Sequence, residues 1–119
     1  MADAALFIGW GESIQGREDR GLQVFSETLA YYAGLQEAGR IESFEPVLLA
    51  PHGGGVGGFI LLRGERARLD EIRSSDEFER LTLKAELVVR DVGVINALIG
   101  EGLAHGMALY EEALGAVAA

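Results

Sequence analysis

The chain has 119 residues, the usual size of one domain, and its 49% hydrophobic and 24% charged residues exclude an intrinsically disordered protein. The formal net charge of −9 argues against a nucleic-acid-binding protein, because an acidic surface repels phosphate. The sequence contains no cysteine, which excludes disulfides, thiolate nucleophiles and cysteine-ligated metal sites.

The amino-terminal stretch "MADAALFIGW" has no cationic region, and its apolar run is too short for a signal peptide. No stretch of the sequence approaches the roughly 20 apolar residues that a membrane-spanning helix needs. We therefore expect a cytoplasmic protein without a membrane partner.

The first half of the chain predicts a strand, a helix and two further strands. The apolar and aromatic run 5–11 is typical of a strand, and segment 17–38 is typical of an amphipathic helix that ends at Gly39. The runs 43–51 and 58–64 predict two strands joined by a glycine-rich loop. The apolar positions of the helix recur at intervals of three and four residues: Leu22, Phe25, Leu29, Tyr32 and Ala33.

The second half predicts helical structure in two pieces over 65–87, a strand over 91–99 and a last helix from about Glu101. Ser74 and Glu77 have the spacing of a capping box, so the second helical piece is expected to begin at Ser74. The last helix carries its apolar residues on one stripe: Leu103, Met107, Tyr110, Leu114 and Val117.

The resulting order β-α-β-β-α-β-α predicts a single α+β domain over 1–119, with the split β-α-β arrangement of ferredoxin-like folds and an extra C-terminal helix. The antiparallel sheet of such folds has the order 4-1-3-2, which places the second strand at an edge. Pro46 and Pro51 both fall within the predicted second strand, and an edge strand tolerates proline because its outer N–H groups have no partner.

The predicted strands are apolar on both faces, as segments 47–50 and 59–62 illustrate. A lone two-layer domain would expose one sheet face to water and would alternate apolar with polar residues. We therefore expect the second face to be covered by the same face of another copy in a two-fold dimer. The alternative is that the last helix folds across the open face of a monomer.

This sequence resembles the dimeric α+β barrel superfamily, in which two ferredoxin-like subunits face their sheets together. The resemblance is carried by "GGFILLRG" followed by "LDEIRSSDEFERL", and the order of elements extends it over residues 5–99. Related members include antibiotic-biosynthesis monooxygenases, EthD-like proteins and YCII-related proteins. The resemblance implies a ligand cavity between sheet and helices or inside the barrel, but no specific subfamily.

The haem-degrading members of the superfamily use an Asn, a Trp and a His. Trp10, Asn96 and His52 or His105 do not fall in the matching elements, so those roles are not carried over to this chain.

The glycine-rich loop contains Gly53, Gly55 and Gly58, which spell G-x-G-x-x-G. A dinucleotide fingerprint needs a helix directly after the glycines, whereas here a strand over 59–63 follows. We expect a connection between two strands and no nucleotide site. Whether the loop is a lid over a cavity or only a turn stays open.

Two residues are candidates for proton transfer. His52 lies where the second strand enters the glycine-rich loop, and histidine titrates near neutrality. Glu12 follows the first strand and is the second candidate. The alternative for His52 is an exposed turn residue without a chemical role.

Three further residues are candidates for a substrate pocket. Trp10 is flanked by glycines, so its indole either stacks on a flat ligand or anchors the core or an interface. Arg63 and Asn96 are polar residues within apolar strands, and each either has a structural partner or points at a ligand oxygen.

These observations predict a homodimer that binds a small apolar or aromatic organic molecule. If the protein is an enzyme, we expect oxygenation, isomerisation or decarboxylation of a carbonyl or phenolic compound, as in a monooxygenase or isomerase that works without a cofactor. We expect neither a cofactor nor a metal. The alternative is a non-catalytic binding or assembly module whose apolar sheet face serves dimerisation only.

Overall fold

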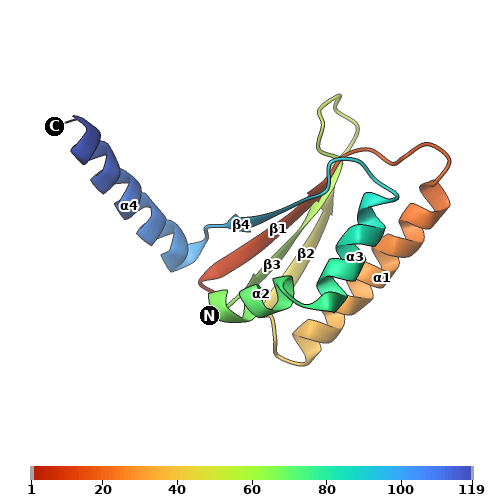
Figure 1. The fold of residues 1–119 in the computed structure, drawn as a ribbon, viewed down its shortest axis with the longest axis horizontal. Helices are drawn as coiled ribbons and strands as arrows, with labels where there is room; N and C mark the ends of the chain where they lie inside the picture. Colours follow the sequence, from red (N-terminus) through yellow and green to blue (C-terminus); the bar gives the residue numbers. More distant parts are fainter. Residues whose placement is uncertain (1, 119) are drawn as a thin grey trace.

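The computed structural model describes residues 2–118 and contains one four-stranded sheet with helices against one of its faces (Figure 1). The chain order is β-α-β-β-α-α-β-α, in which the expected second helical segment forms two helices. The elements are β1 (Ala4–Trp10), α1 (Glu18–Glu37), β2 (Ser43–Leu48), β3 (Gly58–Gly64), α2 (Arg66–Arg73), α3 (Asp76–Glu86), β4 (Gly93–Ala97) and α4 (Gly100–Ala118).

The sheet has the order β2-β3-β1-β4, which is the predicted order, and all of its pairs are antiparallel. In the centre, Leu6 of β1 pairs with Leu62 of β3 on one side and with Asn96 of β4 on the other. β2 lies at an edge of the sheet, the position that tolerates a residue without an N–H group such as Pro46. Pro46 is opposite Ile60 of β3.

Several boundaries differ from the prediction. β2 ends at Leu48, so Pro51 lies in the loop and not in the strand. β4 begins only at Gly93, because Asp91 adopts a positive φ of 57° in the preceding turn. β1 covers Ala4–Trp10 in place of the expected 5–11.

The cap between α2 and α3 is one residue later than expected. The Ser74 hydroxyl donates to the Asp70 carbonyl oxygen at 2.9 Å and so closes the last turn of α2. The Ser75 hydroxyl instead accepts from the Phe78 N–H at 3.3 Å and caps α3. Of the two consecutive serines, Ser74 therefore ends α2 and Ser75 begins α3.

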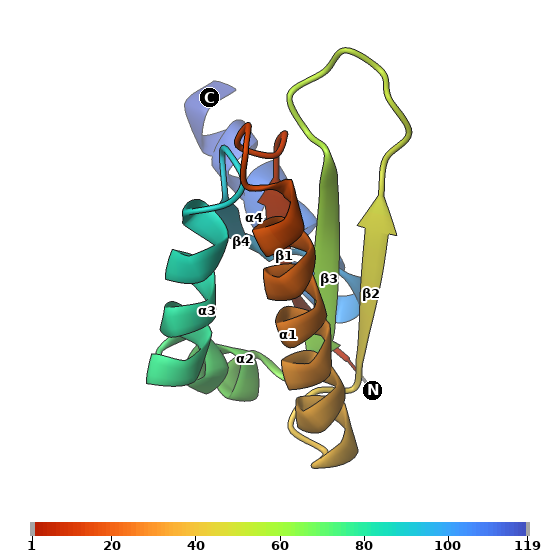
Figure 2. The ribbon, with the colours of Figure 1, turned by 90° about the vertical axis from the view of Figure 1, so that its right-hand side faces the viewer.

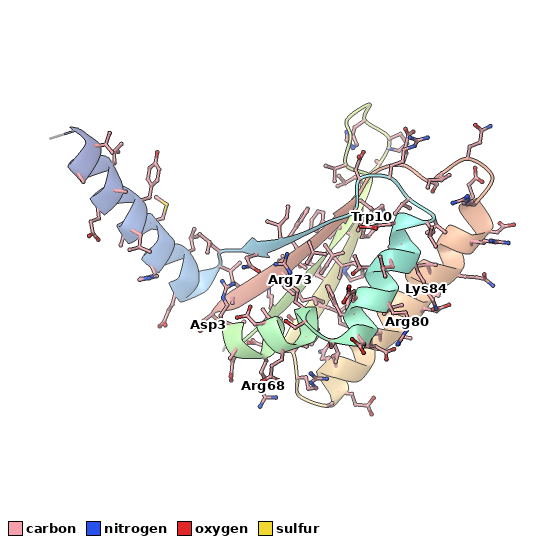
Figure 3. All side chains as sticks on the ribbon, viewed as in Figure 1. Asp3, Trp10, Arg68, Arg73, Arg80 and Lys84 are labelled. Carbon is pink, nitrogen blue, oxygen red and sulfur yellow. The ribbon has the colours of Figure 1, made fainter. Side chains whose placement is uncertain are left out.

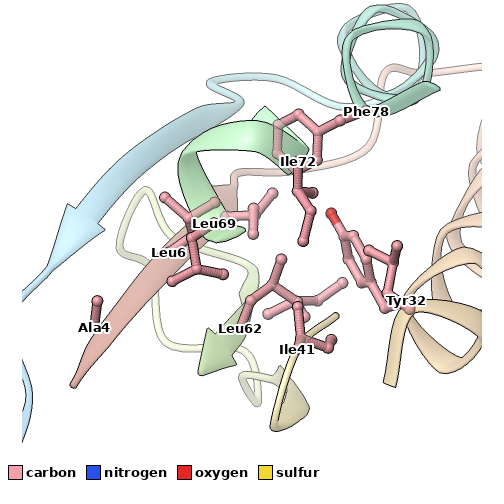
Figure 4. Packing of buried hydrophobic residues seen from close by; sticks show 11 residues of the cluster. Ala4, Leu6, Tyr32, Ile41, Leu62, Leu69, Ile72 and Phe78 are labelled. Carbon is pink, nitrogen blue, oxygen red and sulfur yellow. The ribbon is translucent and has the colours of Figure 1, made fainter. Parts of the chain in front are cut away.

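The hydrophobic core lies between the sheet and the helices α1, α2 and α3 (Figures 2 and 4). Alternate residues of β1 and β3 face these helices, as the period of two in a strand requires. Leu69 and Ile72 of α2 pack on them with essentially no exposed surface. The largest fully buried side chains are Leu6, Ile60, Leu62, Leu69 and Ile72.

The opposite sheet face carries apolar side chains that no helix of the described residues covers. The rings of Phe7 and Phe59 stack there with their centroids 5.0 Å apart. At one end of this face, the Arg63 guanidinium forms an ion pair of 3.1 Å with Glu45. Ile95 is directly opposite Phe7 on β4 and is largely exposed. We call this surface the open face.

α4 does not cover the open face, so the alternative of a self-covered monomer is wrong for this structure. The helix leaves the end of β4 and extends away from the body of the domain (Figure 1). No residue within Gly100–Ala118 is buried.

Candidate functional site

An apolar pocket of about 190 Å³ lies between the sheet and helices α1 and α3, near the carboxyl end of β1. Trp10 contributes the largest ring to its wall, and the ring centroid of Phe25 lies 5.8 Å from the indole in an edge-to-face arrangement. Its lining is Ile8, Trp10, Ser13, Glu18, Gly21, Leu22, Val24, Phe25, Thr28, Leu48, Ile60, Ala85, Val88, Val89 and Val92. We call it the Trp10 pocket.

A glycine on the neighbouring strand leaves the space that the indole of Trp10 occupies. A Cβ atom added at Gly58, which pairs with Trp10, would lie only 2.7 Å from the indole Cζ2 atom and 2.8 Å from the Val47 carbonyl oxygen. Any larger residue at Gly58 would therefore displace the ring. The last glycine of the G-x-G-x-x-G pattern makes room for an aromatic wall and not for a phosphate.

The mouth of the pocket is apolar and open to solvent. Leu22 and Leu48 line it and are 68% and 67% exposed. The polar lining groups are few. The Thr28 hydroxyl donates to the Val24 carbonyl oxygen at 2.7 Å, while Ser13 and Glu18 are exposed. An apolar wall with few polar groups suits an apolar or aromatic molecule with one polar end.

The two proton-transfer candidates line a separate hollow beside the glycine-rich loop. Glu12, His52 and Asp91 surround this open hollow of about 580 Å³. None of the three lines the Trp10 pocket, although Glu12 is only two residues from Trp10 along the chain.

The ring of His52 organises its own loop. Its Nδ1 atom accepts a hydrogen bond from the Gly54 N–H at 3.0 Å, and its Nε2 atom lies 2.7 Å from the Val56 carbonyl oxygen. A neutral ring with its hydrogen on Nε2 satisfies both contacts. For His52 to transfer a proton, the loop would first have to release the ring. Glu12 is exposed and is the better placed of the two candidates.

The two remaining candidates lie away from the pocket, towards the other end of the strands. Arg63 is bound to Glu45 on the open face. Asn96 accepts a hydrogen bond of 3.0 Å from the Arg73 guanidinium, which also donates to the Val94 carbonyl oxygen at 2.9 Å. Figure 3 shows Trp10 near one end of the sheet and Arg73 against its middle. Asn96 thus has a structural partner that sequence reasoning missed.

Sequence reasoning also missed the contribution of α1 to the pocket. Leu22 and Phe25 were expected on the core side of this helix, yet they line the pocket together with Gly21 and Thr28. A glycine one position before the apolar stripe was the available signal, because it leaves a gap where other residues would fill space.

Among residues 2–118, no group of three or more histidine or acidic side chains is arranged to hold a metal ion. None of the helices described is both long and apolar enough to cross a membrane.

Comparisons with known proteins identify the fold. No family model matches the chain, and no curated protein matches its sequence. Among solved structures, it is similar to a dimeric protein of unknown function with a ferredoxin-like fold from Bacteroides fragilis. The TM-score is 0.59 and the identity 9%, over 82% of this chain and 97% of the other. The chain has a ferredoxin-like fold.

A second similar structure is SnoaB, a cofactor-independent oxygenase from Streptomyces nogalater. Its TM-score is 0.51 at 16% identity, and the match covers 83% of this chain and 97% of the other. Both likenesses agree with the fold that the resemblance to the dimeric α+β barrel superfamily implied.

Proposed function

We propose that this protein binds a small, apolar, single-ring organic molecule in the Trp10 pocket. The observation that carries the proposal is the pocket itself, a cavity of about 190 Å³ with an indole and a phenyl ring in its wall and an apolar mouth. Flat aromatic walls favour flat ligands, since offset stacked and edge-to-face ring pairs are attractive.

The size of the pocket narrows the ligand class. Typical pockets for drug-sized ligands have roughly 300–1,000 Å³, whereas an apolar cavity of about 150 Å³ is sufficient for benzene. A volume of about 190 Å³ therefore suits one substituted ring, and a fused multi-ring compound would extend out through the open mouth. The exposed polar groups at the rim, Ser13 and Glu18, suit a hydroxyl or carbonyl substituent that points outward.

We also propose that the protein is a homodimer in which the open faces of two copies meet. The apolar side chains on that face support this, as does the dimeric state of the Bacteroides fragilis protein that shares the fold.

For a catalytic activity, we propose isomerisation or oxygenation of a carbonyl or phenolic compound without a cofactor. In the oxygenation, an activated CH₂ group of the substrate supplies all four electrons to O₂, so that one oxygen atom forms a carbonyl group and the other leaves as water. The likeness to a cofactor-independent oxygenase supports the oxygenation. Of the two candidates for proton transfer, Glu12 would move the proton, because its carboxylate is exposed while His52 is engaged by its loop. Glu12 lines the neighbouring hollow and not the Trp10 pocket, so the reacting atom of the substrate would extend from the pocket toward that hollow. Trp10 would pack the ring. The alternative is binding without turnover.

Fluorescence tests the binding proposal directly, because Trp10 is the only tryptophan of the chain. We expect 4-nitrophenol, whose absorption overlaps indole emission, to quench Trp10 in a saturable manner. Gly21→Leu places a side chain in the pocket and should weaken this binding at least tenfold. Gly34→Leu is the matched control, since Gly34 lies on the same helix with open space around it and does not line the pocket. Equal, unsaturable quenching in all three proteins would refute the proposal.

Oxygen uptake with the phenols that bind tests the activity. Oxygenation should show saturable oxygen consumption that Glu12→Gln lowers by about 10²-fold or more, the usual contribution of a general base. Saturable binding with no oxygen consumption and no isomerised product would favour the non-catalytic alternative.

A further inference from the structure

The helix α4 has the composition of a helix that needs a packing partner. Four of its 19 residues are glycine: Gly100, Gly102, Gly106 and Gly115. Each glycine in a helix interior costs about 1 kcal/mol relative to alanine. The helix contains three glutamates and no lysine or arginine, so it has no ion pairs between successive turns. Most of the stability of a helix in a protein comes from packing of its apolar face and not from intrinsic helix propensity.

The described chain supplies little of this packing. The first turns of α4 approach the body, where an added Cβ at Gly102 would lie 2.5 Å from the Asp3 carbonyl oxygen and one at Gly106 would lie 2.7 Å from the Leu98 side chain. Beyond these turns, every residue of the helix is exposed. The exposed apolar residues include the stripe Leu103, Met107, Tyr110, Leu114 and Val117.

The overall dimensions agree with a missing partner. A compact domain of this length has a radius of gyration of about 13.5 Å, whereas this chain has 16.3 Å and a longest extent of 55 Å. α4 accounts for the extension, because it stands at the opposite end of the long axis from α1 and α3 (Figure 1).

The area needed for a stable dimer points to the occupant. Four strands about 4.8 Å apart and about six residues long present a projected area of about 400 Å² on the open face. A standard stable interface buries about 800 Å² of accessible surface on each partner, and a small flat face of this extent lies below that size. A helix of 19 residues adds a strip about 28 Å long and about 10 Å wide, which raises the projected area to about 680 Å². Accessible surface exceeds its flat projection, so the sheet and the helix together reach the standard size.

We propose that α4 is an exchanged arm, whose apolar stripe packs on a second copy of this chain while the partner's α4 packs on the first. The arm follows β4 after a connection of two residues, and the exposed side chains of Ile95 in β4 and Leu98 in the connection extend the apolar surface from the open face to the helix. A reciprocal exchange satisfies both helices at once, as two-fold symmetry requires. This inference rests on the proposed dimer and adds the surface that completes it.

Hydrogen exchange at several concentrations of the full chain tests the exchange of α4. We expect the amides of residues 103–117 to be protected in the dimer and to lose protection in step with dissociation on dilution. Mass from sedimentation or light scattering must be recorded on the same samples.

Substitutions separate the apolar stripe from the rest of the helix. Met107→Asp together with Leu114→Asp should weaken dimerisation at least a hundredfold, since two large side chains lose their burial. Ala108→Asp is the control, because it adds a carboxylate to the opposite side of α4 and should leave the dissociation constant within about threefold. All of these positions are exposed, so circular dichroism should confirm an unchanged fold.

The outcomes distinguish this inference from the proposed dimer. A dimer whose α4 amides stay unprotected, or whose affinity the stripe variants leave unchanged, overturns the exchanged arm and keeps the dimer on the open face. A monomer at every concentration overturns both. A monomer with protected α4 amides would mean that the helix folds back on its own chain, which also overturns the exchange.

Discussion

The helices α1 and α4 have nearly the same length, 20 and 19 residues, and opposite surroundings. α1 buries Tyr32 and Leu35 against the sheet and shapes the wall of the Trp10 pocket. α4 is the more hydrophobic of the two by mean hydropathy, yet it buries nothing. Each carries one apolar stripe, so amphipathic pattern alone does not decide whether a helix packs within its own domain.

The difference arises from the connections that place the two helices. α1 lies between two strands of the sheet, because β1 precedes it and the turn at Gly39 leads the chain back into the edge strand β2. In this turn the Arg40 N–H donates to the Leu35 carbonyl oxygen at 2.9 Å. α4 follows the other edge strand, and Gly100, with a φ of +50°, directs it away from the sheet. The predictions below test this contrast.

The largest effect on stability is expected from shortening a buried side chain of the core, to which α1 contributes Tyr32 and Leu35 and α2 contributes Leu69. Leu69→Ala removes a side chain that is 1% exposed and should lower the free energy of unfolding by about 2–5 kcal/mol. Leu103→Ala, on the stripe of α4 and 48% exposed, should change it by less than about 0.5 kcal/mol in the dissociated chain. Urea unfolding at high dilution measures both, and equal losses would contradict the contrast.

A smaller effect on stability is expected at Arg73, whose hydrogen bonds connect α2 to β4. Arg73→Ala removes the hydrogen bonds to Asn96 and to the Val94 carbonyl oxygen, and should cost about 1 kcal/mol because the guanidinium is partly solvated. Asn96→Leu should cost less, since it removes only one of these contacts. Neither should alter 4-nitrophenol binding. If Asn96→Leu lost binding of 4-nitrophenol while its stability stayed unchanged, Asn96 would be a ligand-binding residue.

Two glycines on helix surfaces allow a matched comparison. Gly34 of α1 and Gly115 of α4 both have open space where a Cβ would lie, and neither has a positive φ. Gly34→Ala should raise the free energy of unfolding by about 0.5–1 kcal/mol, because α1 unfolds with the core. Gly115→Ala should leave it unchanged in the dissociated chain and increase helicity only. Equal stabilisation by the two substitutions would show that α4 unfolds cooperatively with α1 and the core.

The smallest effect at neutral pH is expected at Tyr32, which is 3% exposed. Burial, and secondarily the neighbouring Tyr31, raises the pKa of the Tyr32 phenol above its usual value. Because the folded pKa lies above the unfolded one, this contribution to stability is complete below about pH 10 and is lost as the pH rises beyond it. Tyr32→Phe should flatten the decline of stability between about pH 10 and pH 12, measured by urea unfolding. An unchanged slope would assign the decline to other groups.

Much of the fold follows from local patterns. The position of each helix and strand could be predicted to within a few residues, since hydrophobic period and glycine punctuation are local properties. The predictions differ from the structure at boundaries, such as the end of β2 before Pro51 and the junction of α2 and α3, where side-chain hydrogen bonds of Ser74 and Ser75 decide the terminal residues. The candidate site was harder to predict from the sequence than the fold. Trp10 lines the pocket as expected for a pocket residue, but Arg63 and Asn96 have partners from other elements.

By itself, the sequence determined the element order, the edge position of the strand with Pro46, and the presence of more apolar surface than one small domain can bury. Only the tertiary structure decided which residues share a cavity, because Trp10, Phe25 and Val88 lie on three segments far apart in the chain. It likewise decided that the glycine at position 58 makes room for an indole, and that α4 leaves the domain. Such facts depend on how elements are placed relative to one another, and no local period or propensity encodes that placement.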